Sequence, residues 1–115
     1  ANSTLTACLD RLFYCTPFDK RMKVGASVAV ARRGGCSATF DQLNKYFQIS
    51  EMPVISGRYW NMVHGATPDE VRQDEEGMQN MRILARNLAW HLKCREVAGI
   101  MPPPREKAIF TNFIR

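Results

Sequence analysis

The sequence lacks any apolar run long enough to cross a membrane, and it does not open with a signal-peptide pattern. A membrane-spanning helix needs about 20 consecutive apolar residues, whereas the clearest apolar run here is the short segment 24–31, VGASVAVA. A signal peptide would show a basic start, an apolar stretch and then small residues. We therefore expect a cytoplasmic protein that neither crosses nor binds a membrane.

The cysteines are too widely spaced to form a C-x-x-C pair, and only two histidines accompany them. Structural zinc sites usually draw their ligands from closely spaced pairs of cysteine and histidine. This spacing argues against a metal centre and favours reduced thiols, which suit a cytoplasmic protein. The cysteines are Cys8, Cys15, Cys36 and Cys94.

No run of lysine and arginine exceeds two residues, although 16 basic residues against 11 acidic ones give a net charge of +5. Nucleic-acid-binding proteins concentrate such charge in patches with interleaved aromatic residues. We therefore expect no nucleic-acid partner, and the local arginine pairs suit a small anionic ligand equally well. A hydrophobic share of 45% in 115 residues is typical of a single globular domain.

Apolar residues recur with helical spacing in the first and last parts of the chain. Residues 2–15 carry such a stripe, and Asn2 or Ser3 is suited to cap the helix. Farther along, the sequence TPDE combines a capping threonine, a proline for the first turn and two acidic residues. It predicts one long helix from Thr67 to near Gly99.

Two short apolar segments predict β-strands. Segment 24–31 does not alternate between polar and apolar residues, which is typical of a parallel strand covered on both faces. A buried helix is the alternative, but the valine content, the short length and the following glycines favour a strand. Segment 52–60, MPVISGRYW, predicts a short second strand, with Pro53 at its start and Gly57 at the end of its apolar part.

An apolar face over residues 40–47 predicts a helix between the two strands. Ser37, or a capping box formed by Thr39 and Gln42, is suited to begin this helix. The order helix, strand, helix, strand, helix then predicts an α/β fold with a parallel sheet. Two parallel strands alone leave helix faces without a sheet to cover, so we expect a larger α/β domain or other chains to complete it.

The proline-rich sequence MPPP separates a folded unit from a tail. We expect residues 1–100 to form the folded part and residues 101–115 to form the tail. Because prolines cannot continue a helix, the tail leaves the last helix there. Its apolar residues Phe110, Phe113 and Ile114 are expected to dock on a neighbour.

The segment 32–35, RRGG, follows the first strand at its carboxyl end, which is the edge where open parallel sheets bind ligands. Glycines let a ligand approach the backbone closely, and the helix N-terminus and the arginines add positive charge. A plain turn with solvated arginines is the alternative. The next residue, Cys36, is either a thiolate favoured by the helix N-terminus or, more simply, a small residue that fits.

Bulky side chains follow in the segment YWNMVHG, at the expected carboxyl end of the second strand. Trp60 and Asn61 are suited either to line a pocket for an aromatic ring or to form a subunit contact. His64 is interpreted as a capping or packing residue, because the sequence identifies no carboxylate or nucleophile beside it. The apolar surface of Tyr59, Trp60 and Met62, with the stripe of Met78 and Met81, predicts a homodimer through this loop and the long helix.

Several segments of the sequence carry a family resemblance. They are LDRLFYC, ARRGGCSATFDQLNKYF, MPVISGRYWNMVHG, the TPDE helix and the closing TNFIR. Together they resemble the flavodoxin-like NAD(P)H-dependent FMN reductase family, and its bacterial branch most of all. The resemblance runs along nearly the whole chain and implies a five-stranded parallel sheet. This chain would be the C-terminal helix-strand-helix-strand-helix part, with the N-terminal strands and the FMN phosphate-binding loop on a portion upstream.

The resemblance implies that FMN is the cofactor and that the loop after the first strand of this chain lies against the isoalloxazine ring. Backbone amides of the glycines would then hydrogen-bond the ring, and an arginine near its pyrimidine side would stabilise the reduced flavin. The implied cofactor-binding residues are Asn2, Ser3, Ala31, Arg32, Arg33, Gly34, Gly35 and Cys36.

The activity implied by the resemblance is hydride transfer from NAD(P)H to flavin and on to a quinone, a flavin or a metal ion. Such transfer needs no side-chain acid or base, so no catalytic side chain is expected. Two alternatives stay open: an electron carrier reduced by a partner protein, and a non-catalytic fragment or interaction module that holds no flavin.

Overall fold

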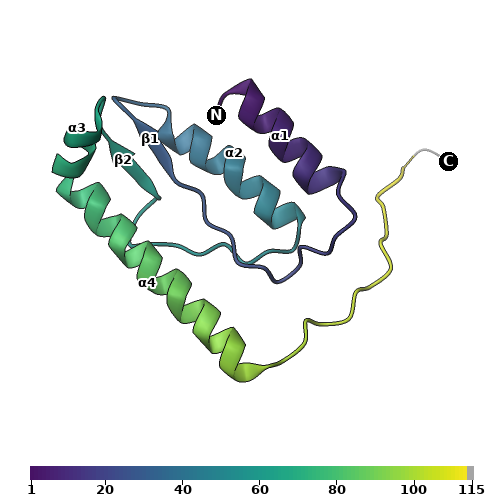
Figure 1. Ribbon diagram of the computed structural model, residues 1–115. Helices are drawn as coiled ribbons and strands as arrows, with labels where there is room; N and C mark the ends of the chain where they lie inside the picture. Colours follow the sequence, from purple (N-terminus) through teal and green to yellow (C-terminus); the bar gives the residue numbers. More distant parts are fainter. Residues whose placement is uncertain (114–115) are drawn as a thin grey trace.

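Helices and strands alternate along the chain in the computed structural model, which describes residues 1–113 (Figure 1). This order confirms the predicted succession of helix, strand, helix, strand and helix, except that the last helix is in two pieces. The elements are α1 (Ser3–Tyr14), β1 (Ala29–Ala31), α2 (Cys36–Ile49), β2 (Met62–His64), α3 (Pro68–Gln73) and α4 (Glu75–Ala98).

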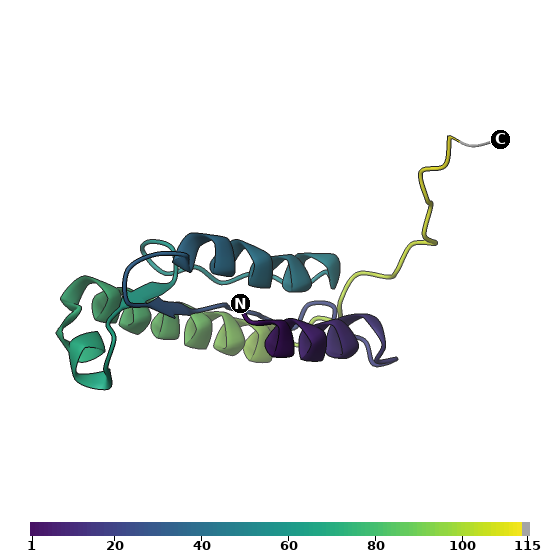
Figure 2. The ribbon, with the colours of Figure 1, turned by 90° about the horizontal axis from the view of Figure 1, so that it is seen from above.

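The two strands pair in parallel, as the sequence predicts for strands joined by a helix. Ala29 pairs with Met62 and Ala31 with His64, and an isolated parallel bridge joins Gly25 to Val54 farther back. Figure 2 shows α2 on one side of this sheet and α4 on the other. The described residues thus form a small layered α/β unit with helices on both faces.

The predicted second strand, 52–60, is wrong in position, because β2 begins only at Met62. The backbone amides of Arg58 and Tyr59 donate to the side chain of Asn80 on α4 and not to a neighbouring strand. The predicted first strand, 24–31, is regular only over its last residues, Ala29–Ala31. A side chain that satisfies backbone amides removes the need for a strand partner.

Helix α1 begins as predicted and packs on α2. The side chain of Asn2 accepts a hydrogen bond from the amide of Leu5 at 2.8 Å, which caps the helix. The ring of Phe13 lies 5.4 Å from that of Tyr46, and the Tyr46 hydroxyl donates to Asp10 at 2.6 Å. This hydrogen bond and the burial of the ring raise the pKa of Tyr46 to about 12.

The predicted start and end of the last helical region are confirmed, but its continuity is not. Thr67 accepts a hydrogen bond from Glu70 at 3.2 Å, and Gly99 ends α4 with a φ of 58°. Asp74 breaks the region, because its carboxylate caps α4 by accepting from the amide of Gly77 at 2.9 Å. The predicted single helix is therefore two helices, α3 and α4.

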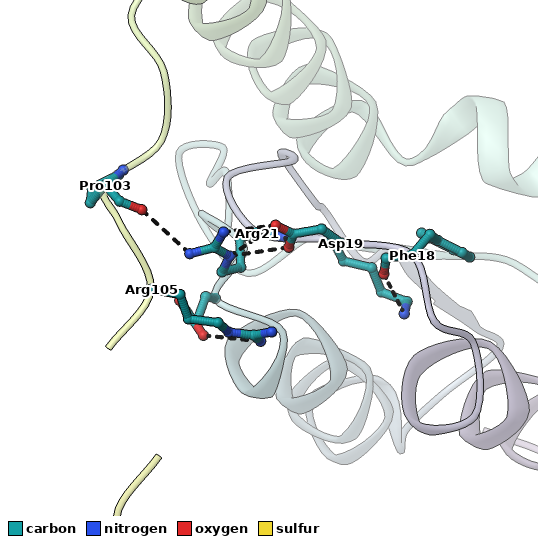
Figure 3. A network of polar contacts seen from close by, with 7 residues as sticks. Phe18, Asp19, Arg21, Pro103 and Arg105 are labelled. Atoms are coloured by element: carbon teal, nitrogen blue, oxygen red, sulfur yellow. Dashed lines mark hydrogen bonds and ion pairs between the residues drawn. The ribbon is translucent and has the colours of Figure 1, made fainter. Parts of the chain in front are cut away.

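The tail continues from the end of α4 and leaves the body of the protein (Figures 1 and 2). Figure 3 shows Arg21 paired with Asp19 and donating to the carbonyl of Pro103, at 3.3 Å. The Arg21 hydrogen bonds lower the pKa of Asp19 to about 2. Arg105 pairs with Glu51 at 3.6 Å, and residues 106–113 beyond it are exposed.

The docking of the tail on a neighbour stays a prediction. Phe110 and Phe113 are 84% and 92% exposed, so no part of the described chain covers them. Ile114, the third residue of that prediction, lies outside the described residues. None of the helices in residues 1–113 is long and apolar enough to cross a membrane.

The sheet is open on the outer side of β1, where no described strand pairs with it. Val28 and Val30 are exposed, whereas Ala29 between them is buried. On the outer side of β2, the amide of His64 donates to Asp74 at 2.7 Å. That amide is therefore not free to pair with a further strand.

Candidate functional site

The loops that follow the two strands lie side by side at one edge of the sheet (Figure 1). The first loop, residues 32–35, leads from β1 into α2, and the second leads from β2 into α3. A hydrogen bond of 3.1 Å from the amide of Gly65 to the carbonyl of Ala31 joins them. Because the strands are parallel, this edge carries both carboxyl ends, the usual position of a ligand site in such sheets.

Helix α2 begins without a side-chain cap, which corrects the expectation that Ser37 or a Thr39–Gln42 capping box starts it. The capping residue is Gly35, whose φ of 88° lies in the left-handed region that favours glycine. The helix therefore starts earlier than expected, and Ser37 and Thr39 lie within its first turn. The first amides of α2 remain open to an external acceptor.

The surface above Gly34 and Gly35 is open. A Cβ atom built on either glycine would meet no other atom within 4 Å. The neighbouring Arg32 and Arg33 are exposed and form no ion pair or hydrogen bond with the described residues. A flat or anionic ligand could thus approach the backbone closely while two guanidinium groups stay available to it.

The start of the chain lies beside this loop, at the same end of α2. The amino group of Ala1 donates to the hydroxyl of Thr39 at 3.1 Å. The structure therefore brings Asn2 and Ser3 near the N-terminal end of α2, which residues 31–36 lead into. The side chain of Asn2 is occupied there by capping α1.

The side chain of Cys36 is buried, with only 4% of the residue exposed. A thiol in that position fills space beneath the helix start and does not face the loop surface. This burial fits the simpler interpretation of Cys36 as a small packing residue. Its backbone amide still belongs to the open first turn of α2.

Trp60 and Asn61 lie at the other end of the strands, which corrects the expectation that they follow a strand. They precede β2, and the amide of Ala29, at the start of β1, donates to the carbonyl of Asn61 at 2.9 Å. Asn61 is 1% exposed, so it can neither line a surface pocket nor form a subunit contact. Neither of its side-chain polar atoms has a partner within the described chain.

Trp60 lines a cavity, and its two interpretations, a pocket for an aromatic ring and a subunit contact, stay predictions. The cavity has a volume of about 290 Å³ and lies between residues of β2 and of the first part of α4. The rings of Tyr59 and Trp60, which both line it, lie 4.8 Å apart. The lining residues are Tyr59, Trp60, Met62, His64, Asp74, Glu76, Gly77 and Asn80.

His64 has a carboxylate beside it that sequence reasoning missed. Its Nδ1 atom lies 3.9 Å from Oδ2 of Asp74, at the edge that also holds Ala31. The amides of Gly77 and His64 donate to this carboxylate and, with the nearby imidazole, lower the pKa of Asp74. The sequence DEEG, a capping residue followed by an acidic first turn, was the available signal.

No metal centre forms within residues 1–113, where no group of three or more histidine, cysteine or acidic residues comes together. The four cysteines are free thiols. Comparisons of the chain with protein-family models, with curated proteins and with solved structures found no match.

Proposed function

We propose that this chain belongs to a flavodoxin-like domain that binds FMN and acts as an NAD(P)H-dependent oxidoreductase. The parallel order of β1 and β2, with helices on both faces, supports the flavodoxin-like part of the proposal. The open outer side of β1 supports it as well, because a doubly wound sheet continues beyond that strand.

The observation that carries the proposal is that α2 begins without a side-chain cap, next to two glycines with open space above them. Arg32 and Arg33 have no side-chain partner within residues 1–113, and the space above Gly34 and Gly35 is open, so these four residues can offer contacts to a ligand. A planar ring can lie against backbone only where no Cβ intervenes, which Gly34 and Gly35 allow. The residues present therefore fit the edge of a flavin ring.

Each part of the loop has a distinct role in this proposal. The open amides at the start of α2 would donate to oxygen and nitrogen acceptors on the ring. Arg32 or Arg33 would stabilise the negative charge of the reduced ring. Bound FMN would supply the hydride chemistry between NAD(P)H and a quinone, flavin or metal-ion acceptor. The protein would orient the ring and adjust its electronics.

The test compares two glycines with similar backbones in the full-length protein. Gly35 and Gly99 both have positive φ values and both face open space, but only Gly35 lies in the loop. Gly35→Val should weaken FMN binding at least about tenfold, because it adds a branched side chain where the ring approaches. Gly99→Val should leave FMN binding unchanged, and a flavin titration measures both.

Three results would overturn or redirect the proposal. Equal FMN affinity in parent and Gly35→Val would remove the loop from the site. A parent protein that binds no FMN would favour the interaction module. A yellow protein whose absorbance NADPH does not bleach would favour the electron carrier, which draws its electrons from a partner protein.

A further inference from the structure

The cavity that Trp60 lines is a second candidate site, built from other residues than the loop 32–35. We call it the Trp60 cavity, and all its lining residues come from the stretch 59–80. Figure 1 shows β2, α3 and the start of α4, which make up most of this stretch, on one side of the molecule. The described chain therefore forms the cavity by itself. Its volume of about 290 Å³ is near the lower end of the range for ligand pockets, about 300–1,000 Å³, and suits a small molecule.

Part of the wall of the Trp60 cavity is aromatic and held in place. The rings of Tyr59 and Trp60 are 4.8 Å apart, with an angle of 43° between their planes. Asn80 fixes the backbone beneath them, because its side chain donates to the carbonyls of Tyr59 and Trp60 at 3.2 and 2.9 Å. The face of an aromatic ring attracts cations, and tryptophan does so most strongly. A wall that is already in place also loses little freedom when a ligand binds.

The same cavity carries two carboxylates, Asp74 and Glu76. The carboxylate of Asp74 accepts from the amide of Gly77 at 2.9 Å and from that of His64 at 2.7 Å, one bond to each oxygen. These hydrogen bonds lower the pKa of Asp74, so it is ionised at neutral pH. Because a carboxylate has about four acceptor positions, each oxygen of Asp74 can still accept a hydrogen bond from a ligand.

No lysine or arginine within residues 1–113 lines the Trp60 cavity to neutralise these carboxylates. This is unexpected in a chain with 16 basic residues and a net charge of +5. Glu76 also borders a neighbouring hollow with three arginines, but among the described residues it pairs with none of them. Two of these arginines donate to Gln79 and Asp69 instead. The cavity is therefore a negatively charged place on a positively charged protein.

We propose that the Trp60 cavity binds a small organic cation, a protonated amine whose apolar body lies against the two rings. The ammonium group would donate to Asp74 and Glu76 through charge-assisted hydrogen bonds. The faces of Tyr59 and Trp60 would contact the apolar body and attract the charge.

The carboxylates distinguish this ligand from its competitors. An aromatic wall alone fits a neutral ring equally well, whereas the two negative charges favour a cation and disfavour an anion. A bare metal ion fits less well, because it takes several ligating side chains. No group of three or more histidine, cysteine or acidic residues that could hold one comes together in residues 1–113.

The first experiment compares two matched probes by calorimetry on the full chain. The cation is 2-phenylethylammonium, which is charged at neutral pH as lysine is, and 2-phenylethanol has nearly the same shape without the charge. The cation should bind with a dissociation constant below about 1 mM, and at least about tenfold more tightly than the alcohol. Added salt should weaken the binding of the cation, because it screens the carboxylates, and should not weaken that of the alcohol.

The second experiment removes the charge of one carboxylate. Glu75 and Glu76 are adjacent, exposed and in the first turn of α4, but only Glu76 lines the Trp60 cavity. Glu76→Gln should weaken the binding of the cation about three- to fivefold and leave that of the alcohol unchanged. The matched control, Glu75→Gln, makes the same change of charge in the same helical turn. It should alter the affinity for the cation by less than about twofold.

The third experiment removes an aromatic face. Trp60 and Trp90 are 52% and 63% exposed, but only Trp60 lines the cavity. Trp60→Leu keeps an apolar side chain and removes the ring, so the binding of the cation should weaken about fivefold. Trp90→Leu is the control, and it should leave the binding of both probes unchanged.

Three results would overturn this inference. A parent protein that binds neither probe at roughly millimolar concentration would mean that the cavity is not a binding site for such molecules. Equal affinities for the cation and the alcohol would make it a pocket for a neutral ring. Equal effects of Glu75→Gln and Glu76→Gln would assign the attraction to the whole start of α4. None of these measurements involves FMN or the loop 32–35, so the failure of this inference and that of the proposed function can be told apart.

Discussion

The side chain of Asn80 on α4 forms hydrogen bonds with both the amide and the carbonyl of Tyr59. Its Oδ1 atom accepts from the Tyr59 amide at 3.0 Å, and its Nδ2 atom donates to the Tyr59 carbonyl at 3.2 Å. The same carboxamide accepts from the amide of Arg58 at 2.7 Å and donates to the carbonyl of Trp60 at 2.9 Å. All its hydrogen-bonding capacity is therefore used on one loop.

Removal of this carboxamide should destabilise the protein more than removal of a similar one on the same helix. Asn80→Ala leaves the amides of Arg58 and Tyr59 and the carbonyl of Tyr59 without this partner, while the Trp60 carbonyl keeps the amide of Met62. We expect a loss of about 3 kcal/mol in the free energy of unfolding. Asn87→Ala removes a single hydrogen bond, to Ser56, and should cost about 1 kcal/mol. Urea unfolding of both variants measures the difference, and equal losses would contradict the prediction.

The position of β2 shows where sequence reasoning fails. The helix starts at Asn2 and Thr67 and the helix end at Gly99 could be predicted, because each depends on residues within one turn. The displacement of the second strand could not be predicted, because it depends on Asn80, which lies more than 20 residues beyond the loop that it binds. A lone asparagine in a helix has no pattern that reveals such a contact.

The candidate site shows the same division. The glycine loop at the carboxyl edge could be predicted, because strand order and loop composition are local features of the sequence. The burial of Asn61 and the carboxylate beside His64 could not, because both depend on how α4 packs on β2. Sequence patterns predict which segments meet more readily than they predict which side chains touch.

Acid should weaken the junction between β2 and α4. The folded-state pKa of Asp74 is lower than its ordinary value of 3.8, so its stabilising contribution is present above about pH 4 and is lost as the pH falls through the folded value. Asp74→Ala should lower the free energy of unfolding by about 1–2 kcal/mol at neutral pH. It should also make that free energy less dependent on pH in the acid range. The control is Asp41→Ala, on the exposed side of α2, which should keep the parent's pH dependence.

Base should weaken the contact between α1 and α2. The pKa of Tyr46 is raised to about 12, first by its hydrogen bond to Asp10, so that contact is intact below pH 10 and is lost as the pH rises through 12. Asp10→Asn should lower the pKa of Tyr46 toward 10, as measured by tyrosinate absorbance. The variant Tyr46→Phe identifies the part of the tyrosinate absorbance that comes from Tyr46. If the pKa of Tyr46 stays near 12 in Asp10→Asn, burial alone raises it.

The two loop arginines should affect flavin reduction more than flavin binding, if the proposed site is correct. Oxidised FMN has a neutral ring, whereas the reduced ring carries negative charge that a nearby guanidinium stabilises. Arg32→Ala and Arg33→Ala are tested separately in the full-length protein, because both side chains are exposed and neither pairs with any of residues 1–113. The variant that loses the ring-facing arginine should have a midpoint potential lower by on the order of tens of millivolts, with oxidised FMN still bound. Arg82→Ala, on α4, changes the net charge equally and should leave the potential unchanged. If neither loop variant differs from Arg82→Ala, then residues 32–35 form only a turn.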